Sequence, residues 1–214
     1  MSNLLSKASI LLTPTATSDG KLHNIKPNTT TGDFDFTRGT AATRVNSNGV
    51  IESVASGLPR IDFTGGTGQV LLEPASTNLF LNSATLSTQD VTTSANVFTV
   101  SFYGTGSITL SGTHSATLNG TGTNNRVSLS FTPSSGSLTC TVSGTVTNAQ
   151  IEQKSFATSY IETSGTSATR NQEEANSSGN TSLINSTEGV LYGELASFTN
   201  SGESERNISL SNST

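Results

Sequence analysis

Two histidines are the first candidates for proton-transfer chemistry in this chain, because imidazole exchanges a proton near neutral pH. His23 lies in a polar stretch near the N-terminus, and His114 lies beside an expected turn. Neither belongs to a nucleophile motif of the Gly-Xaa-Ser-Xaa-Gly type with partners at suitable positions. We therefore expect both histidines to face solvent, and we expect the protein not to be an enzyme.

Asp33 and Asp35 form a second candidate group, since residues two apart on a strand share one face. Two carboxylates about 5–10 Å apart can cleave a glycosidic bond. The alternative is the polar face of an edge strand, or a contact to a neighbouring chain, because Phe34 and Phe36 alternate with the two aspartates. We favour the polar face. The chain also lacks the Asp-rich loop spacing of a Ca²⁺ site, and we expect no metal and no cofactor.

Three aromatic residues are candidates for a sugar-binding platform: Tyr103, Phe156 and Tyr160. Aromatic faces stack on the apolar face of a sugar ring, a task for which Trp and Tyr are common choices, and this chain has no Trp. The alternative is that this part of the chain is a spacer and that receptor binding belongs to a further C-terminal part. Both interpretations stay open on the sequence.

The composition favours many short β-strands over helices or disorder. Hydrophobic residues make up 31% of the 214 residues and charged residues only 12%, while Ser and Thr account for about a third. Thr packs well on a pleated surface, and Ser and Gly supply turns. The net charge of −5 gives no basic surface for nucleic acid. The single cysteine, Cys140, excludes an intrachain disulfide, and it alternates with Leu138 and Val142 as a buried thiol would.

Strand signals recur along the chain and predict an all-β protein of several segments. The best-defined segment is 97–162, where apolar residues alternate with polar ones and predict an antiparallel β-sandwich. In 33–75, Thr43–Val45 and Val50–Val54 flank Asn48-Gly49 and predict a hairpin. The remaining segments are an extended N-terminal arm, a connector, a linker and the start of a further β domain, at 1–32, 76–96, 163–188 and 189–214.

The two ends of the chain carry further expectations. The apolar run Ala8–Leu12 is too short for a signal peptide or a membrane span, and we expect the arm to gain order by docking on a partner. The strands expected at 189–198 and 206–210 cannot bury a core of their own. Either they add to another sheet, or the natural polypeptide continues; we favour the second interpretation.

The first resemblance rests on three runs: FTRGTAATRVNSNGVI at 36–51, LPRIDF at 58–63 and LLEPASTNL at 71–79. Together they resemble a module of phage head-fibre, tail-fibre and minor structural proteins. Five charged residues stand at the matched positions: Arg38, Arg44, Arg60, Asp62 and Glu73. They are candidates for ion pairs, either between subunits or within one chain to fix loops, since Arg binds carboxylates with two hydrogen bonds.

The second resemblance rests on AQIEQKSFATSYIET at 149–163 and ATR at 168–170. These runs are similar to the closing phrase of jelly-roll modules, related to carbohydrate-binding modules, in phage tail proteins; Glu162 stands where that phrase usually has Pro. The segment after Glu188 looks like the first strands of a laminin-G or concanavalin-like domain.

The resemblance implies a structural protein of a bacteriophage fibre or spike, located in the virion and assembled in the bacterial cytoplasm. It implies a homo-oligomer, with a trimer favoured, and contacts to other virion proteins through the N-terminal arm. A host glycan bound through the C-terminal part is a further implied partner, and neither nucleic acid nor a membrane is expected. The alternative function is a carbohydrate-binding module that itself grips host polysaccharide.

Overall fold

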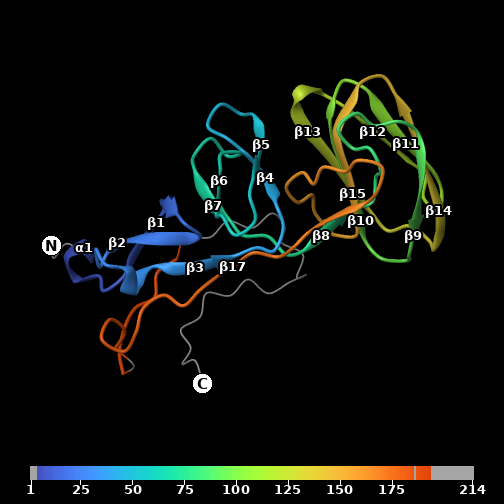
Figure 1. The fold of residues 1–214 in the computed structure, drawn as a ribbon. Helices are drawn as coiled ribbons and strands as arrows, with labels where there is room; N and C mark the ends of the chain where they lie inside the picture. Colours follow the sequence, from blue (N-terminus) through green and yellow to red (C-terminus); the bar gives the residue numbers. More distant parts are fainter. Residues whose placement is uncertain (1–3, 186, 194–214) are drawn as a thin grey trace.

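The computed structural model describes residues 4–185 and 187–193, and it confirms the expected all-β class. Within these residues, helical structure is limited to α1 (Leu4–Lys7) and the 3-10 turn η1 (Thr30–Gly32). Figure 1 shows a sheet near the N-terminus at one end of the molecule, a β-sandwich at the other end, and the strands β4 to β7 between them.

The N-terminal sheet has the strand order β1-β2-β3-β17, formed by β1 (Leu11–Ser18), β2 (Lys21–Lys26), β3 (Phe34–Thr37) and β17 (Glu174–Asn176). The expected extended arm is therefore wrong for β1 and β2, which pair with each other and with β3. Asp19 and Gly20 make the turn with φ of 49° and 73°, the conformation of a two-residue hairpin turn. Leu22 and Phe36 are buried in this sheet.

The β4–β7 module consists of two hairpins. In the first, β4 (Ala42–Val45) pairs with β5 (Ile51–Val54), as the sequence predicts. Gly49 has a φ of 77° in the turn and donates its N–H to the carbonyl of Asn46 at 2.9 Å. In the second, β6 (Arg60–Asp62) pairs with β7 (Gln69–Leu71).

The sandwich is built from eight strands: β8 (Ser76–Asn78), β9 (Gln89–Thr93), β10 (Phe98–Gly104), β11 (Ser107–Gly112), β12 (Ala116–Asn119), β13 (Gly122–Phe131), β14 (Gly136–Ser143) and β15 (Val146–Glu152). One sheet has the order β13-β10-β15, and the N–H of Leu79, just after β8, reaches the carbonyl of Ile151 in β15 at 2.9 Å. The other sheet has the order β12-β11-β14-β9. Strands that follow each other in the sequence lie in different sheets, except β11 and β12, so the eight strands form a two-sheet sandwich of the jelly-roll kind.

The sandwich core follows the alternation seen in the sequence. The side chains of Phe98, Val100 and Phe102 in β10 face Ile108, Leu110, Leu138 and Cys140 of the other sheet, and all seven are buried. Val127 and Leu129 are half-buried against this core. Burial, with a smaller effect of Asp90, raises the pKa of the Cys140 thiol to about 12. The cysteine therefore fills space as a small hydrophobic residue.

Two segments that were expected to be connections contain short strands. The expected connector contains β8 and β9, which belong to the sandwich. The expected linker contains β16 (Ala168–Arg170), which pairs with β8, and β17, which pairs with β3. These short strands escaped detection because polar residues such as Asn78 and Arg170 occupy their buried positions.

The chain returns along its own path after the sandwich. Figure 1 shows the late segment running back from β15 to lie beside β3, which is the β17–β3 pairing. Residues 189–193 form no strand. The rest of the two strands expected at 189–198 and 206–210 lies outside the described residues.

Candidate functional site

Five charged residues from distant parts of the chain meet in one buried group, here named the Arg–Glu cluster: Arg38, Arg60, Glu73, Arg170 and Glu173. Arg38 follows β3, Arg60 begins β6, Glu73 follows β7, Arg170 ends β16, and Glu173 precedes β17. Arg60 is 0% exposed and Arg170 is 1% exposed, so the charges have no contact with water. The cluster joins the β4–β7 module, the end of the sandwich and residues 168–176, which run back from the sandwich and are here named the returning segment.

Arg60 stands at the centre of the cluster. Its Nε donates to Oε1 of Glu173 at 2.6 Å, and its Nη2 donates to Oε2 of Glu173 at 2.5 Å and to Oε2 of Glu73 at 2.9 Å. Arg38 Nη1 reaches Oε1 of Glu173 at 2.7 Å, and Arg170 Nη1 lies 2.8 Å from Oε2 of Glu73. Charges therefore alternate along the cluster, which is the arrangement that gives the strongest hydrogen bonds.

The arginines also tie down backbone carbonyls. Arg38 donates to the carbonyl groups of Thr40, Val54, Ala55 and Leu58, and thereby fixes the loop between β5 and β6. Arg60 Nη1 donates to the carbonyl of Thr43 at 2.7 Å, and Arg170 Nη2 donates to that of Pro74 at 2.7 Å. Among the described residues, Arg170 Nε is a buried donor of the cluster that has no partner. The many other hydrogen bonds offset the cost of burying the charges.

The environment sets the protonation states in the cluster. Burial alone would raise the pKa of Glu73, but the charges of Arg170 and Arg60 outweigh burial and hold the pKa below its usual value. Burial likewise opposes charge on Arg60, yet Glu173 and Glu73 raise its pKa. For Arg170, burial prevails over Glu73 and lowers the pKa. Glu73 is therefore held as a carboxylate by its two arginine neighbours.

A second buried polar group adjoins the Arg–Glu cluster and closes the end of the sandwich. Glu152 is 0% exposed and accepts hydrogen bonds from Ser76 Oγ, from Gln150 Nε2, and from the N–H and hydroxyl of Thr158. Arg170 Nη1 contacts the same Thr158 hydroxyl at 3.3 Å. The two groups therefore touch, and the loop after β15 is held against β8 and β16.

Asn78 holds the same loop through its side-chain amide. Its Nδ2 donates to the carbonyls of Ala149 and Ile161, and its Oδ1 accepts from the N–H groups of Phe80 and Ile151. A fully buried amide with four partners fixes the backbone on both sides. Sequence reasoning missed Asn78, Gln150, Glu152 and Arg170 as site residues; all four stand inside the motif runs, which was the available signal.

The five charged residues expected to form ion pairs have different roles in the structure. Arg38, Arg60 and Glu73 pair inside the chain, and their buried charged groups are not exposed to a neighbouring subunit. Arg44 pairs with Glu52 at 2.6 Å on the partly exposed first hairpin. Asp62 accepts hydrogen bonds from the backbone N–H groups of Val45 and Thr64 instead of pairing with an arginine in the described chain.

The expected aromatic platform is wrong for two of its three residues. Phe156 is 7% exposed and Tyr160 is 6% exposed, and the Tyr160 hydroxyl lies 2.7 Å from Ser83 Oγ. The loop after β15 folds back on the sandwich, so these rings pack inward and cannot offer a face to a sugar. Tyr103, in β10, is half-buried.

The two acidic candidates have different partners, and the two histidines lie in different parts of the fold. Asp35 pairs with Lys21 at 2.7 Å, and Asp33 contacts Nδ1 of His23 at 2.9 Å, so each carboxylate has its own partner. His114 stacks on Phe131 with ring centroids 4.7 Å apart. Both histidines are half-buried instead of fully solvent-facing. Within the described residues, no group of three or more His, Cys, Asp or Glu side chains has the arrangement of a metal site.

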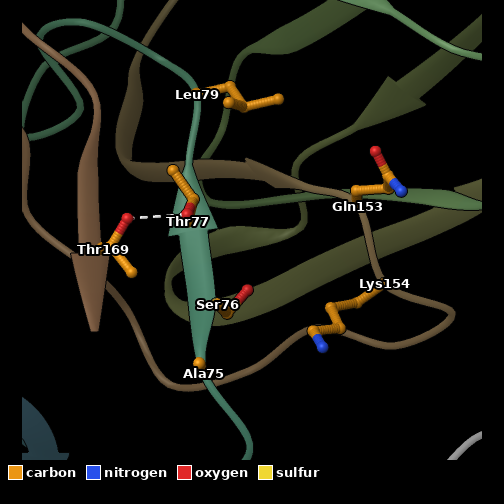
Figure 2. Close-up of a pocket in the computed structure, with 7 residues that line it drawn as sticks. All are labelled: Ala75, Ser76, Thr77, Leu79, Gln153, Lys154 and Thr169. Atoms are coloured by element: carbon orange, nitrogen blue, oxygen red, sulfur yellow. Dashed lines mark hydrogen bonds between the residues drawn. The ribbon is translucent and has the colours of Figure 1, made fainter. Parts of the chain in front are cut away.

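A shallow surface pocket of about 370 Å³ lies where β8, β16 and the end of β15 meet. Thr77 and Thr169 are joined by a hydrogen bond of 2.7 Å. Figure 2 shows this bond as a dashed line, with Gln153 and Lys154 on the other side of the pocket. Gln153 also lines a second pocket of about 280 Å³ with Ala95, Asn96, Val97 and Thr132. The linings offer hydroxyl, amide and ammonium groups, which are donors and acceptors for a polar ligand.

Comparison of the chain with protein families, with curated proteins and with solved structures found no match. Across the described residues, no helix has the length and apolar character needed to span a membrane. The fold and the site define an all-β protein with a β-sandwich, in which Arg38, Arg60, Glu73 and Arg170 of the motif runs form ion pairs in the interior.

Proposed function

We propose that this chain is a structural component of a tailed-phage virion, the N-terminal anchoring part of a fibre or spike used in host attachment. The Arg–Glu cluster is the observation that carries the proposal. Residues from both sets of runs that resemble phage structural proteins, such as Arg60 and Arg170, meet in one buried group. If the runs serve a mechanical role, their charged residues are expected to meet where parts of the chain join, as these do between the β4–β7 module and the sandwich.

The proposed mechanism is mechanical. A fibre must transmit load between its attachment to the particle and its distal modules, and here the chain enters and leaves the sandwich at the same end, beside the Arg–Glu cluster. Separating the sandwich from the β4–β7 module would expose or unpair buried charges, which is costly. In this proposal, the cluster keeps the two parts in a fixed arrangement.

Association of several chains is part of the proposal. Three large apolar side chains of the β4–β7 module are exposed: Val50 by 56%, Leu58 by 40% and Leu72 by 48%. We expect them to contribute to a homo-oligomer, with a trimer favoured, because exposed apolar groups gain free energy when they leave water. The N-terminal part would contact other virion proteins.

Light scattering behind size-exclusion chromatography tests this proposal. A mass near three times 22.0 kDa is the expected result, and replacing both Leu58 and Leu72 by Ser should shift it toward one chain. Leu81→Ser is the matched control, because Leu81 is 43% exposed but lies outside the module. A monomer at all concentrations would overturn the proposed assembly.

A second candidate function is carbohydrate binding, which the pocket in Figure 2 supports. Its lining residues Thr77, Gln153, Lys154 and Thr169 offer polar groups to sugar hydroxyls. Glycan-array binding that is lost on Gln153→Ala and retained on Gln172→Ala would favour this function, since Gln172 is exposed elsewhere on the chain. Absence of binding to any bacterial surface glycan on the array would count against it.

A further inference from the structure

Ser18, His23 and Asp33 form a hydrogen-bonded relay on one face of the N-terminal sheet. Ser18 Oγ lies 2.7 Å from Nε2 of His23, and Nδ1 of the same ring lies 2.9 Å from Oδ2 of Asp33. The two ring nitrogens therefore serve different partners. This is the connectivity by which a carboxylate orients an imidazole and the imidazole activates a serine.

The strand register explains why the three residues meet. Ser18 pairs with Lys21 across the β1–β2 hairpin, and Lys21 pairs with Asp35 across β2 and β3. Residues directly opposite each other, and residues two positions away on a strand, share one face of a sheet. His23 is two positions after Lys21. Asp33 is two positions before Asp35, in extended backbone just ahead of β3, so the two side chains lie on the same face.

The protonation of the relay follows from its surroundings. The backbone N–H of Asn24 donates to Asp33 Oδ1 at 2.8 Å and is the main cause that lowers the pKa of Asp33, with a further contribution from His23. An ionised carboxylate can only accept hydrogen bonds, so Nδ1 of His23 carries the hydrogen. In the neutral ring Nε2 is then the acceptor, and the Ser18 hydroxyl donates to it.

Accessibility increases along the relay in the direction that catalysis requires. Asp33 is 6% exposed, the His23 side chain is 34% exposed, and Ser18 is exposed. A carboxylate shielded from water orients the ring, while the hydroxyl stays within reach of a substrate. The Asp19-Gly20 turn that follows Ser18 lies outside the hairpin ladder, so its backbone N–H groups are not used by that ladder.

We propose that Ser18 is a nucleophile for acyl transfer, with His23 as its general base and Asp33 as the residue that positions His23. Ser18 Oγ would form a bond to the carbonyl carbon of an ester while Nε2 of His23 takes the hydroxyl proton. The tetrahedral intermediate then expels the alcohol, which receives that proton from His23. Water, activated by His23 in the same way, releases the acid and restores Ser18.

The surroundings of Ser18 define the class of ester. The salt bridge between Lys21 and Asp35 lies on the same face at 2.7 Å, which favours a polar alcohol part. Ser18 is itself exposed, so an acyl group bound to it would lie at the surface, which favours a short acyl part such as acetyl. The expected substrates are short-chain esters of polar alcohols. This inference is independent of the proposed fibre function.

Two readouts on the whole chain test the inference. A fluorophosphonate probe should label Ser18, identified by peptide mass spectrometry, and the wild-type chain should hydrolyse p-nitrophenyl acetate. Ser18→Ala should abolish labelling, and His23→Gln should slow hydrolysis by about a hundredfold or more. Ser111→Ala, at an exposed serine of β11, should change neither readout.

Asp33 needs a readout that separates positioning from folding. Asp33→Asn should slow hydrolysis while Asp33→Glu restores part of the rate, and both variants should retain the wild-type circular-dichroism spectrum. An unlabelled Ser18 in the wild-type protein, or wild-type hydrolysis no faster than that of Ser18→Ala, would overturn the inference. The relay would then only stabilise the hairpin.

Discussion

Arg60 and Glu173 are 113 positions apart in the chain, yet two hydrogen bonds of 2.6 and 2.5 Å join them in the interior. This pair fastens the returning segment to the β4–β7 module, where a more apolar chain would use packed side chains. Only 31% of the residues are hydrophobic. Buried ion pairs are therefore expected to be a main source of order at this junction.

Removing the central arginine should test that dependence. Arg60→Met keeps much of the side-chain volume but leaves Glu73 and Glu173 buried with fewer partners, and we expect a loss of about 3–5 kcal/mol in the free energy of unfolding. Urea denaturation followed by circular dichroism measures it. Arg44→Met is the control, because its pair with Glu52 is partly exposed and should contribute at most about 1 kcal/mol. Equal losses in the two variants would contradict a special role for the cluster.

Acid should weaken the fold through Glu73. The folded-state pKa of Glu73 lies below its usual value of 4.5, since Arg170 and Arg60 outweigh the opposing effect of burial. A depressed carboxyl pKa contributes stability above the unfolded-state pKa, and this contribution is lost as the pH falls through the folded-state pKa. We expect Glu73→Gln to be less stable than wild type at neutral pH and to lose less of its remaining stability in acid. Urea midpoints measured from neutral pH to about pH 3 give the comparison; parallel curves would contradict it.

Cys140 should report global opening of the sandwich. The side chain is 0% exposed, and burial, with a smaller effect of Asp90, raises its pKa to about 12, so the reactive thiolate is scarce at neutral pH. We expect no reaction with a thiol reagent until the protein unfolds, and full reaction in denaturant. Ser111→Cys should react at once in the folded protein, because that site is exposed. Rapid modification of Cys140 in the native state would show that the core is not closed as described.

Two glycines in turns should respond very differently to alanine. A Cβ on Gly120 would lie 2.2 Å from the carbonyl oxygen of Gly104 and 2.9 Å from the Phe102 ring, whereas a Cβ on Gly65 would meet nothing within 4 Å. We expect Gly120→Ala to lower stability by roughly 1–3 kcal/mol through overpacking and Gly65→Ala to stay within about 0.5 kcal/mol of wild type. Thermal or urea unfolding separates the two cases, and a neutral Gly120→Ala would contradict the close packing between this turn and β10.

The sequence predicted those parts of the fold that rest on regular alternation or on a strong turn signal. Phe98, Val100 and Phe102 marked an inward face of the sandwich, and Asn48-Gly49 marked the first hairpin of the β4–β7 module. The second turn of this kind, Asp19-Gly20, stood in a segment interpreted as an arm, and its hairpin was missed.

The missed site residues share a physical cause. A buried Arg170 or Asn78 has no apolar signature, and its burial is favourable only when partners from distant positions are present, such as Glu73 for Arg170 and Ile161 for Asn78. The relay has the same character, because Ser18 and His23 meet across a hairpin and Asp33 comes from the position just before the next strand. Short-range patterns do not contain such pairings.

The central claim is that the β4–β7 module and the segment returning from the sandwich are coupled through buried charges within one chain. A double-mutant cycle on Arg60 and Glu173 tests it most directly. The unfolding free energies of wild type, Arg60→Met, Glu173→Leu and the double variant would be measured by urea denaturation. We expect the double variant to lose less stability than the sum of the two single losses, with a coupling energy of about 1–3 kcal/mol. Losses that add to within about 0.3 kcal/mol would show that the two residues act independently and would contradict the account.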